Sequence, residues 1–183
     1  MSYNFSQFKQ GADGTIEWLK KEYLGIRSNQ ANPGILDSVR VDMYGSKMPI
    51  NQVASVLGES ARSLRITPWD KSAVKMIDSA IREANLGVSV SVDDQGLRVA
   101  FPELTDDRRQ ALAKLAKQKL EEARVRVRNE REKVHSDADR QEKEGSIGKD
   151  DVFRAKQDLQ KMVDETNQKL EELYEKKTKE ISE

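Results

Sequence analysis

The chain has 183 residues, of which 36% are hydrophobic, 35% charged and 5% aromatic, and 32 basic residues balance 32 acidic ones. This length suits one ordinary domain or two small ones. The lack of cysteine excludes disulfides, thiolate metal sites and a thiol nucleophile. The sequence has neither a signal-peptide pattern nor an apolar run that could span a membrane, so we expect a cytoplasmic protein.

The N-terminal segment is predicted to form one amphipathic helix. Apolar residues recur at intervals of three and four from Phe5 to Ile26, which places them on one face of a helix that ends at about Ser28.

Residues 31–104 differ in character from the segments on either side. They contain all four prolines and several β-branched runs, among them SLRITPW and LGVSVSVDDQGLRVAF. The alternation in VSVSV, bounded by DDQG, predicts a β-hairpin. One helix is expected between these strands, with Asp70 near its start and Gly87 at its end. The segment therefore predicts a small domain of strands and one helix.

A second long helix is predicted from Thr105 to about Lys143, where the chain has neither glycine nor proline. Its centre, EARVRVRNERE at residues 122–132, alternates valine and arginine as a strand would. A strand there would interrupt a continuous apolar stripe of helical spacing and would have no turn on either side, so we interpret the alternation as accidental.

A third helix follows the turn EGSIG, and its apolar seam has the same spacing. The seam consists of Val152, Ala155, Leu159, Met162, Thr166, Leu170 and Leu173. The sequence thus predicts an α+β protein in which an antiparallel three-helix bundle, residues 1–29 and 105–183, carries an inserted α/β domain at 30–104. The two crossings between these domains form a candidate hinge, made of Asn29, Gln30, Asn32, Pro33, Pro102, Glu103, Leu104 and Thr105.

Four arginines lie within eight positions of the second helix. At about 100° per residue, Arg124, Arg128 and Arg131 share one flank of the apolar stripe, whereas Arg126 projects from the opposite flank. Residues 108–140 carry 11 basic against 6 acidic residues, so the neutral total conceals a basic helix. The arginines either pair with neighbouring glutamates on a solvated surface or recognise phosphate, for which the planar guanidinium is suited.

Little else in the sequence indicates chemistry. The single histidine, His135, has no suitable partner for a metal site, and no glycine-rich phosphate loop or catalytic grouping is present. Trp18 and Trp69 are more typical of packing than of base stacking. We therefore expect neither an enzyme nor a bound metal or cofactor.

Four segments, GIRSNQANPGILDSVRVDMYG, SLRITPWDKS, LTDDRR and VRVRNERE, together resemble the ribosome recycling factor family over nearly the whole chain. The resemblance implies a near L-shaped monomer that binds the large ribosomal subunit after termination. With elongation factor G and GTP, it would split the ribosome into subunits and release mRNA and tRNA, and the partner would hydrolyse the GTP. The positions that match RNA-contacting arginines of the family are Arg27, Arg128 and Arg131, and Arg124 on the same flank completes the candidate rRNA-binding set.

The chain departs from the family pattern at two places. Ser28, Asn29 and Gln30 stand where the family commonly has threonine, glycine and arginine, and Glu132 stands where it often has a second basic residue. These departures predict a hinge and an RNA affinity that differ from the family's. The residues alone also leave open a different class of function, a coiled-coil structural or co-chaperone module that binds a protein partner.

Overall fold

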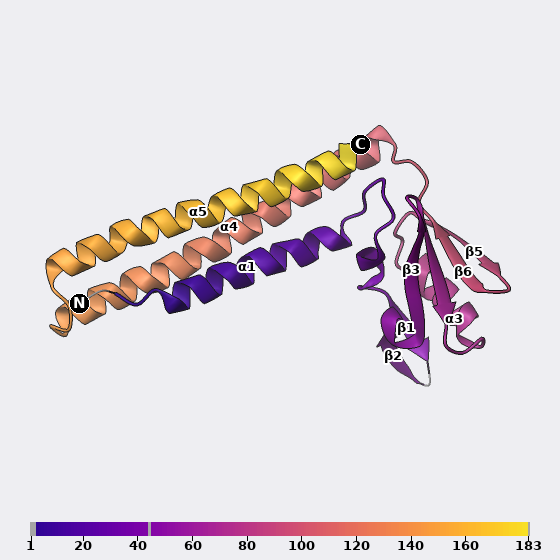
Figure 1. Cartoon of the computed structure of the whole chain (residues 1–183), viewed down its shortest axis with the longest axis horizontal. Helices are drawn as coiled ribbons and strands as arrows, with labels where there is room; N and C mark the ends of the chain where they lie inside the picture. Colours follow the sequence, from indigo (N-terminus) through magenta and orange to yellow (C-terminus); the bar gives the residue numbers. More distant parts are fainter. Residues whose placement is uncertain (1–2, 44, 183) are drawn as a thin grey trace. The chain divides into compact units, whose positions relative to one another are not determined.

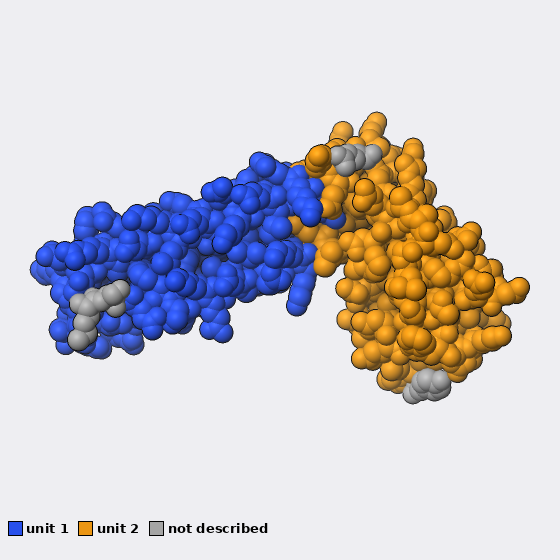
Figure 2. Space-filling view, in the orientation of Figure 1, with its two compact units in different colours: residues 1–22, 114–177 blue, residues 23–113, 178–183 orange. Residues whose placement is uncertain are grey.

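The computed structural model describes residues 3–43 and 45–182, and it confirms an α+β protein with long helices and a small antiparallel sheet domain (Figure 1). The chain divides into two compact units (Figure 2): unit 1 comprises residues 1–22 and 114–177, and unit 2 comprises residues 23–113 and 178–183. The predicted domain boundaries at 29/30 and 104/105 stay a prediction, because compactness does not reveal which segments move together. Within the described residues, no helix is long and apolar enough to cross a membrane.

Unit 1 contains most of α1 (Ser6–Gly25), which runs antiparallel to α4 (Asp106–Lys143). The Tyr3 hydroxyl donates to Asp137 at 2.7 Å, whereas Lys119 Nζ lies 3.0 Å from the Glu22 carboxylate. As the residue numbers rise along α1, the numbers of the residues that it contacts on α4 fall, so the two helices run antiparallel. Burial and the neighbouring Asp137 carboxylate raise the pKa of Tyr3, so its hydroxyl remains a proton donor at neutral pH.

The helix α4 is uninterrupted through the alternating valines and arginines, which confirms the helical interpretation of that segment. Asp106 and Asp107 lie in its first turn, where negative charge stabilises a helix. Small and β-branched side chains dominate its buried stripe, which consists of Ala116, Leu120, Ala123, Val127, Val134 and Ala138. These small side chains permit the close approach of the two neighbouring helices.

The helix α5 (Lys149–Ser182) runs antiparallel to α4. Lys156 pairs with Asp139 at 2.6 Å and Glu171 pairs with Arg124 at 2.5 Å, which fixes the register between the two helices. The apolar side chains that α5 buries are Val152, Ala155, Leu159, Val163, Leu170 and Ile181. The sequence predicted Met162 in the buried seam, but Met162 is only half-buried and the next residue, Val163, is buried. At this point of α5, the buried seam therefore contains Val163 in place of Met162.

The strands of unit 2 form a four-stranded antiparallel sheet in the order β3-β4-β6-β5. Its strands are β3 (Ala54–Ser60), β4 (Ser63–Pro68), β5 (Ser89–Asp93) and β6 (Gly96–Ala100). The remaining elements between α1 and α4 are η1 (Pro33–Leu36), β1 (Arg40–Met43), β2 (Ser46–Pro49), α2 (Ile50–Val53) and α3 (Ala73–Glu83). Strands β1 and β2 pair with each other, and the predicted hairpin is that of β5 and β6.

The core of unit 2 lies between the sheet and α3. Ile77 and Ile81 of α3 and Leu64, Ile66 and Leu97 of the sheet are almost fully buried there. The hairpin turn depends on Gly96, whose φ of +134° places the site of a Cβ 2.3 Å from the Ile66 carbonyl oxygen. Only glycine fits this close approach of two strands.

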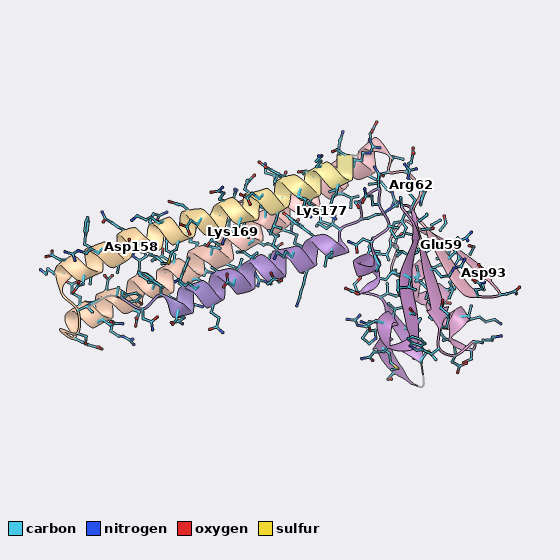
Figure 3. The ribbon with its side chains drawn as sticks, viewed as in Figure 1. Glu59, Arg62, Asp93, Asp158, Lys169 and Lys177 are labelled. Atoms are coloured by element: carbon cyan, nitrogen blue, oxygen red, sulfur yellow. The ribbon has the colours of Figure 1, made fainter. Side chains whose placement is uncertain are left out.

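The sheet also carries a charged network in which arginines and acids satisfy one another. Arg65 pairs with Glu59 at 2.8 Å and with Asp93 at 2.5 Å, and Arg98 pairs with Glu59 at 2.6 Å. Hydrogen bonds from the two arginines lower the pKa of Glu59 to about 2, so this carboxylate stays ionised at physiological pH. Glu59 and Asp93, labelled in Figure 3, belong to two different strands of the sheet.

The two tryptophans have different environments. Trp18 is half-buried and packs as expected, against cations of α4. Trp69 is 69% exposed, which contradicts the expectation that it packs. It lies in the irregular segment between β4 and α3, outside the periodic pattern that would have given it a buried face.

Candidate nucleic-acid interface

The helix α4 directs its arginines to different sides, as helical phase predicts. Arg124 donates to Glu171 of α5 at 2.5 Å and to Glu121 of its own helix at 2.7 Å. The Arg126 guanidinium lies over the ring of Trp18 in α1, with its Cζ 3.9 Å from the ring centroid. Arg124 therefore faces α5 and Arg126 faces α1, which confirms that they occupy opposite flanks.

Arg131, on the flank of Arg124, is half-buried and partly neutralised. Its Nη2 donates to Glu132 at 2.8 Å, and its buried Nε has no hydrogen-bond partner within the part of the chain that the structure describes. This hydrogen bond lowers the pKa of Glu132, which therefore remains a carboxylate at neutral pH. Glu132, which stands where the family often has a basic residue, is thus the residue that pairs with Arg131.

Arg128 is the most available arginine of this flank. It is exposed, and among residues 3–43 and 45–182 its side chain has neither a hydrogen bond nor an ion pair. Its charge helps to lower the pKa of Glu132, but an exposed guanidinium that makes no hydrogen bond of its own can bind a phosphate without first breaking one. Helical spacing places Arg124, Arg128 and Arg131 along one side of α4 in unit 1.

Arg27, the fourth candidate, lies in unit 2 and is 6% exposed. Its Nη1 donates to the Gly87 carbonyl at 2.5 Å and its Nη2 donates to the Pro102 carbonyl. The guanidinium also lies over the Phe101 ring, 5.8 Å from the centroid. Burial, followed by the nearby positive charge of Arg108, lowers the pKa of Arg27. The structure therefore gives Arg27 contacts inside unit 2 and does not group it with the arginines of α4.

These contacts join three segments that are distant in sequence. Arg27 follows α1, Gly87 lies between α3 and β5, and Pro102 follows β6. Gly87 has a φ of +70°, which favours glycine, and a Cβ there would lie 2.3 Å from Arg108 Nη1 and 2.9 Å from Arg27 Nη1. The sequence contained little sign of this role, because an arginine at the end of an amphipathic helix usually extends into solvent.

The two crossings of the candidate hinge are joined to each other. The Asn29 side chain is buried, and its Oδ1 accepts from the backbone N–H of Leu104 at 3.2 Å. Asn29 does not have a positive φ, since Asn85 is the only non-glycine residue with one among those described. A glycine could not make this hydrogen bond. Gln30, by contrast, is exposed.

Several of the other hinge candidates lie at the start of a helix or form an ion pair or hydrogen bond within unit 2. Asn32 accepts from the backbone N–H of Gly34 at 2.9 Å and so caps η1, whose first residue is Pro33. Glu103 pairs with Arg62 at 2.8 Å, and Thr105 accepts from a backbone N–H in the first turn of α4 at 3.4 Å. Every hinge candidate lies within unit 2, and their role in motion stays a prediction.

Replacing Arg27 with methionine is expected to lower the free energy of unfolding of unit 2 by about 1–3 kcal/mol. Methionine retains much of the apolar volume, but the carbonyls of Gly87 and Pro102 lose a charged donor. Hydrogen exchange of the backbone amides of β4 and β6, which belong to unit 2, measures this change.

The matched control for that variant is Arg62→Met, which removes an arginine whose side chain is 53% exposed. A surface ion pair of this kind contributes about 0–1 kcal/mol, so the control should unfold almost as the unmodified protein does. Equal small losses in both variants would show that the contacts of Arg27 do not stabilise the unit.

The elements and the arginines of α4 together define an α+β helical-bundle protein with one basic helix and an inserted antiparallel-sheet domain. The family model described as ribosome recycling factor matches residues 19–181, and the chain belongs to that family. It is 40% identical over 177 residues to the ribosome-recycling factor of Clostridioides difficile, covering 97% of this chain and 96% of the relative. It is 41% identical over 180 residues to that of Rhizorhabdus wittichii, covering 98% and 97%.

Two solved structures resemble the whole chain. A solution structure of the ribosome recycling factor aligns with a TM-score of 0.73 at 34% identity, covering 97% of this chain and 95% of that one. A second match, also at 34% identity, comes from models of the T. thermophilus ribosome recycling factor and the E. coli elongation factor G bound to the E. coli post-termination complex. Its TM-score is 0.67, and it covers 97% of this chain and 96% of that chain.

Proposed function

We propose that this protein binds the large subunit of the post-termination ribosome and, with elongation factor G and GTP, splits the ribosome into subunits. Release of mRNA and tRNA follows from that separation. The protein itself acts as a monomeric, non-enzymatic factor in the cytoplasm, needs no cofactor, and leaves GTP hydrolysis to its partner.

The observation that carries this proposal is the match to ribosome recycling factors over nearly the full length of both chains. A structural relative at 34% identity occurs in models of a post-termination complex that also holds elongation factor G. The basic face of α4 is consistent with a partner made of RNA, because phosphate contacts dominate the affinity of proteins for nucleic acids.

The arginines contribute unequally to this proposed contact. Arg128 is free to bind a backbone phosphate, whereas Arg131 must share its charge with Glu132 and Arg124 must share its charge with Glu171. We assign Arg27 an indirect role, in which it holds the crossings of the hinge rather than touching RNA. The hinge would let the inserted domain change its orientation while the ribosome is split.

The decisive experiment combines the purified protein with post-termination ribosomes, elongation factor G and GTP, and measures subunit separation by light scattering. Separation is expected only when all components are present. If omission of this protein made no difference, the proposed function would be wrong. A structural or co-chaperone module would instead leave ribosomes intact and show no salt-dependent binding to large subunits.

A further inference from the structure

Two arginines at the centre of α4, Arg126 and Arg128, form no hydrogen bond or ion pair with a carboxylate among the described residues. They differ in how they are held. Arg128 extends from the helix and stacks on no described aromatic ring. Arg126 stacks on Trp18, with its Cζ 3.9 Å from the ring centroid. Arg126 is therefore an exposed cation whose position is fixed by an aromatic ring.

Within the described part of the chain, the N–H groups of Arg126 donate no hydrogen bond, because the neighbouring acids are already engaged. Glu122 and Glu130, one turn away on either side, could each pair with it. However, Glu122 pairs with Lys119 at 3.1 Å, and Glu130 pairs with Lys133 at 2.6 Å. Stacking on an aromatic ring uses the flat face of a guanidinium and leaves its N–H edges available for hydrogen bonds.

Trp18 is the positioning residue of this pair. It lies on α1, is half-buried, and also has Lys119 Nζ 5.6 Å from its ring centroid. A free arginine loses much side-chain freedom when it binds a ligand, whereas a stacked arginine has already lost part of it. The contact between α1 and α4 therefore presents a preorganised guanidinium at the surface of unit 1.

We propose that Arg126, held by Trp18, binds a backbone phosphate of ribosomal RNA on the α1 side of α4. This inference rests on the proposed function. A polyanion is favoured over a single acidic side chain because residues 108–140 carry 11 basic against 6 acidic residues. Arg126 and Arg128 project about 160° apart around the helix, so they would contact phosphates on either side of its exposed face. Helical phase places Arg126 on the flank opposite Arg124 and Arg128. Its stacking on Trp18 makes this opposite flank a second candidate for phosphate contact.

Trp18 supplies a direct test, because its fluorescence should respond when a ligand binds the arginine stacked on it. A Trp69→Phe variant leaves Trp18 as the only tryptophan. Its emission is expected to change on titration with deproteinised large-subunit rRNA. Adding Arg126→Gln should weaken binding about three- to tenfold and lower the slope of log affinity against log salt by about one, as loss of one phosphate contact requires.

Arg154→Gln is the matched control, since Arg154 is an exposed arginine of α5 with no hydrogen bond or ion pair among the described residues, and its loss changes the net charge equally. It should leave the salt slope unchanged. Trp18→Leu, measured by filter binding, should weaken binding as Arg126→Gln does, and the two losses should not add, whereas Trp18→Tyr should retain most of the affinity.

Three results would overturn this inference: no response of Trp18 emission to rRNA, equal losses for Arg126→Gln and Arg154→Gln, or competition by polyglutamate as effective as that by rRNA. The last would identify an acidic protein surface as the ligand. Ribosome splitting is a separate measurement. A protein that splits ribosomes while its Trp18 does not respond would refute the inference about Arg126 and leave the proposed function standing.

Discussion

The variant Leu159→Ala is expected to lower the free energy of unfolding by about 2–5 kcal/mol, which is the usual cost of a buried leucine-to-alanine change. Leu159 is completely buried in α5. The ion pair of Lys156 with Asp139 fixes the register between α5 and α4, and this register places Leu159 close to the buried Ala138. The short side chain of Ala138 cannot extend to fill the space, so a cavity should remain. Urea denaturation followed by helical circular dichroism measures the loss.

Two further variants of α5 test the register of the helix. Lys161→Ala, at an exposed position, should change stability by no more than about 0.5 kcal/mol. Met162→Ala, at a half-buried position, should cost less than Leu159→Ala because fewer contacts are lost. If Met162 proved as costly as Leu159, the seam of α5 would lie where the sequence predicted it and not where the structure has it.

The sequence predicted the helical part of the fold well because each long helix buries one continuous stripe. Periodicity is a local property, so it identified α4 even through RVRVR, where alternation suggested a strand. It also located the hairpin of β5 and β6 from the turn residues DDQG. The order of the sheet was not accessible in this way, because β4 pairs with β6 across the intervening α3 and β5.

The candidate site was only partly predictable, because its contacts join residues that are distant in sequence. Helical phase placed Arg124 and Arg126 on opposite flanks, but it could not supply their partners on other helices. The burial of Arg27 depends on carbonyls 60 and 75 residues away, and no local pattern contains that information. Phase identifies the side of a helix from which a side chain projects, whereas tertiary contacts decide whether that side chain remains free.

The double variant Arg128→Glu, Arg131→Glu is expected to weaken binding to large ribosomal subunits by well over tenfold and to reduce the salt slope by about two. Each replacement would remove one of the proposed phosphate contacts and put a negative charge in its place. Arg128 should contribute more of the loss, because it has no internal partner within the described residues, whereas Arg131 is paired with Glu132. Filter binding over a range of salt concentrations measures both quantities.

Helicity and thermal stability should change little in this variant, because Arg128 is exposed and the half-buried Arg131 makes an ion pair with an exposed glutamate, a kind of pair that contributes about 0–1 kcal/mol to folding. Arg154→Glu on α5 makes the same charge change as Arg128→Glu alone, away from α4, and should weaken binding far less than that single variant. Glu132→Gln should have the opposite effect, because it frees Arg131 from its carboxylate partner while keeping a side chain of the same size. Equal losses for Arg128→Glu and Arg154→Glu would show that bulk charge governs binding. A gain of affinity in Glu132→Gln, together with a loss in Arg128→Glu, would identify this side of α4 as a directed phosphate-binding face.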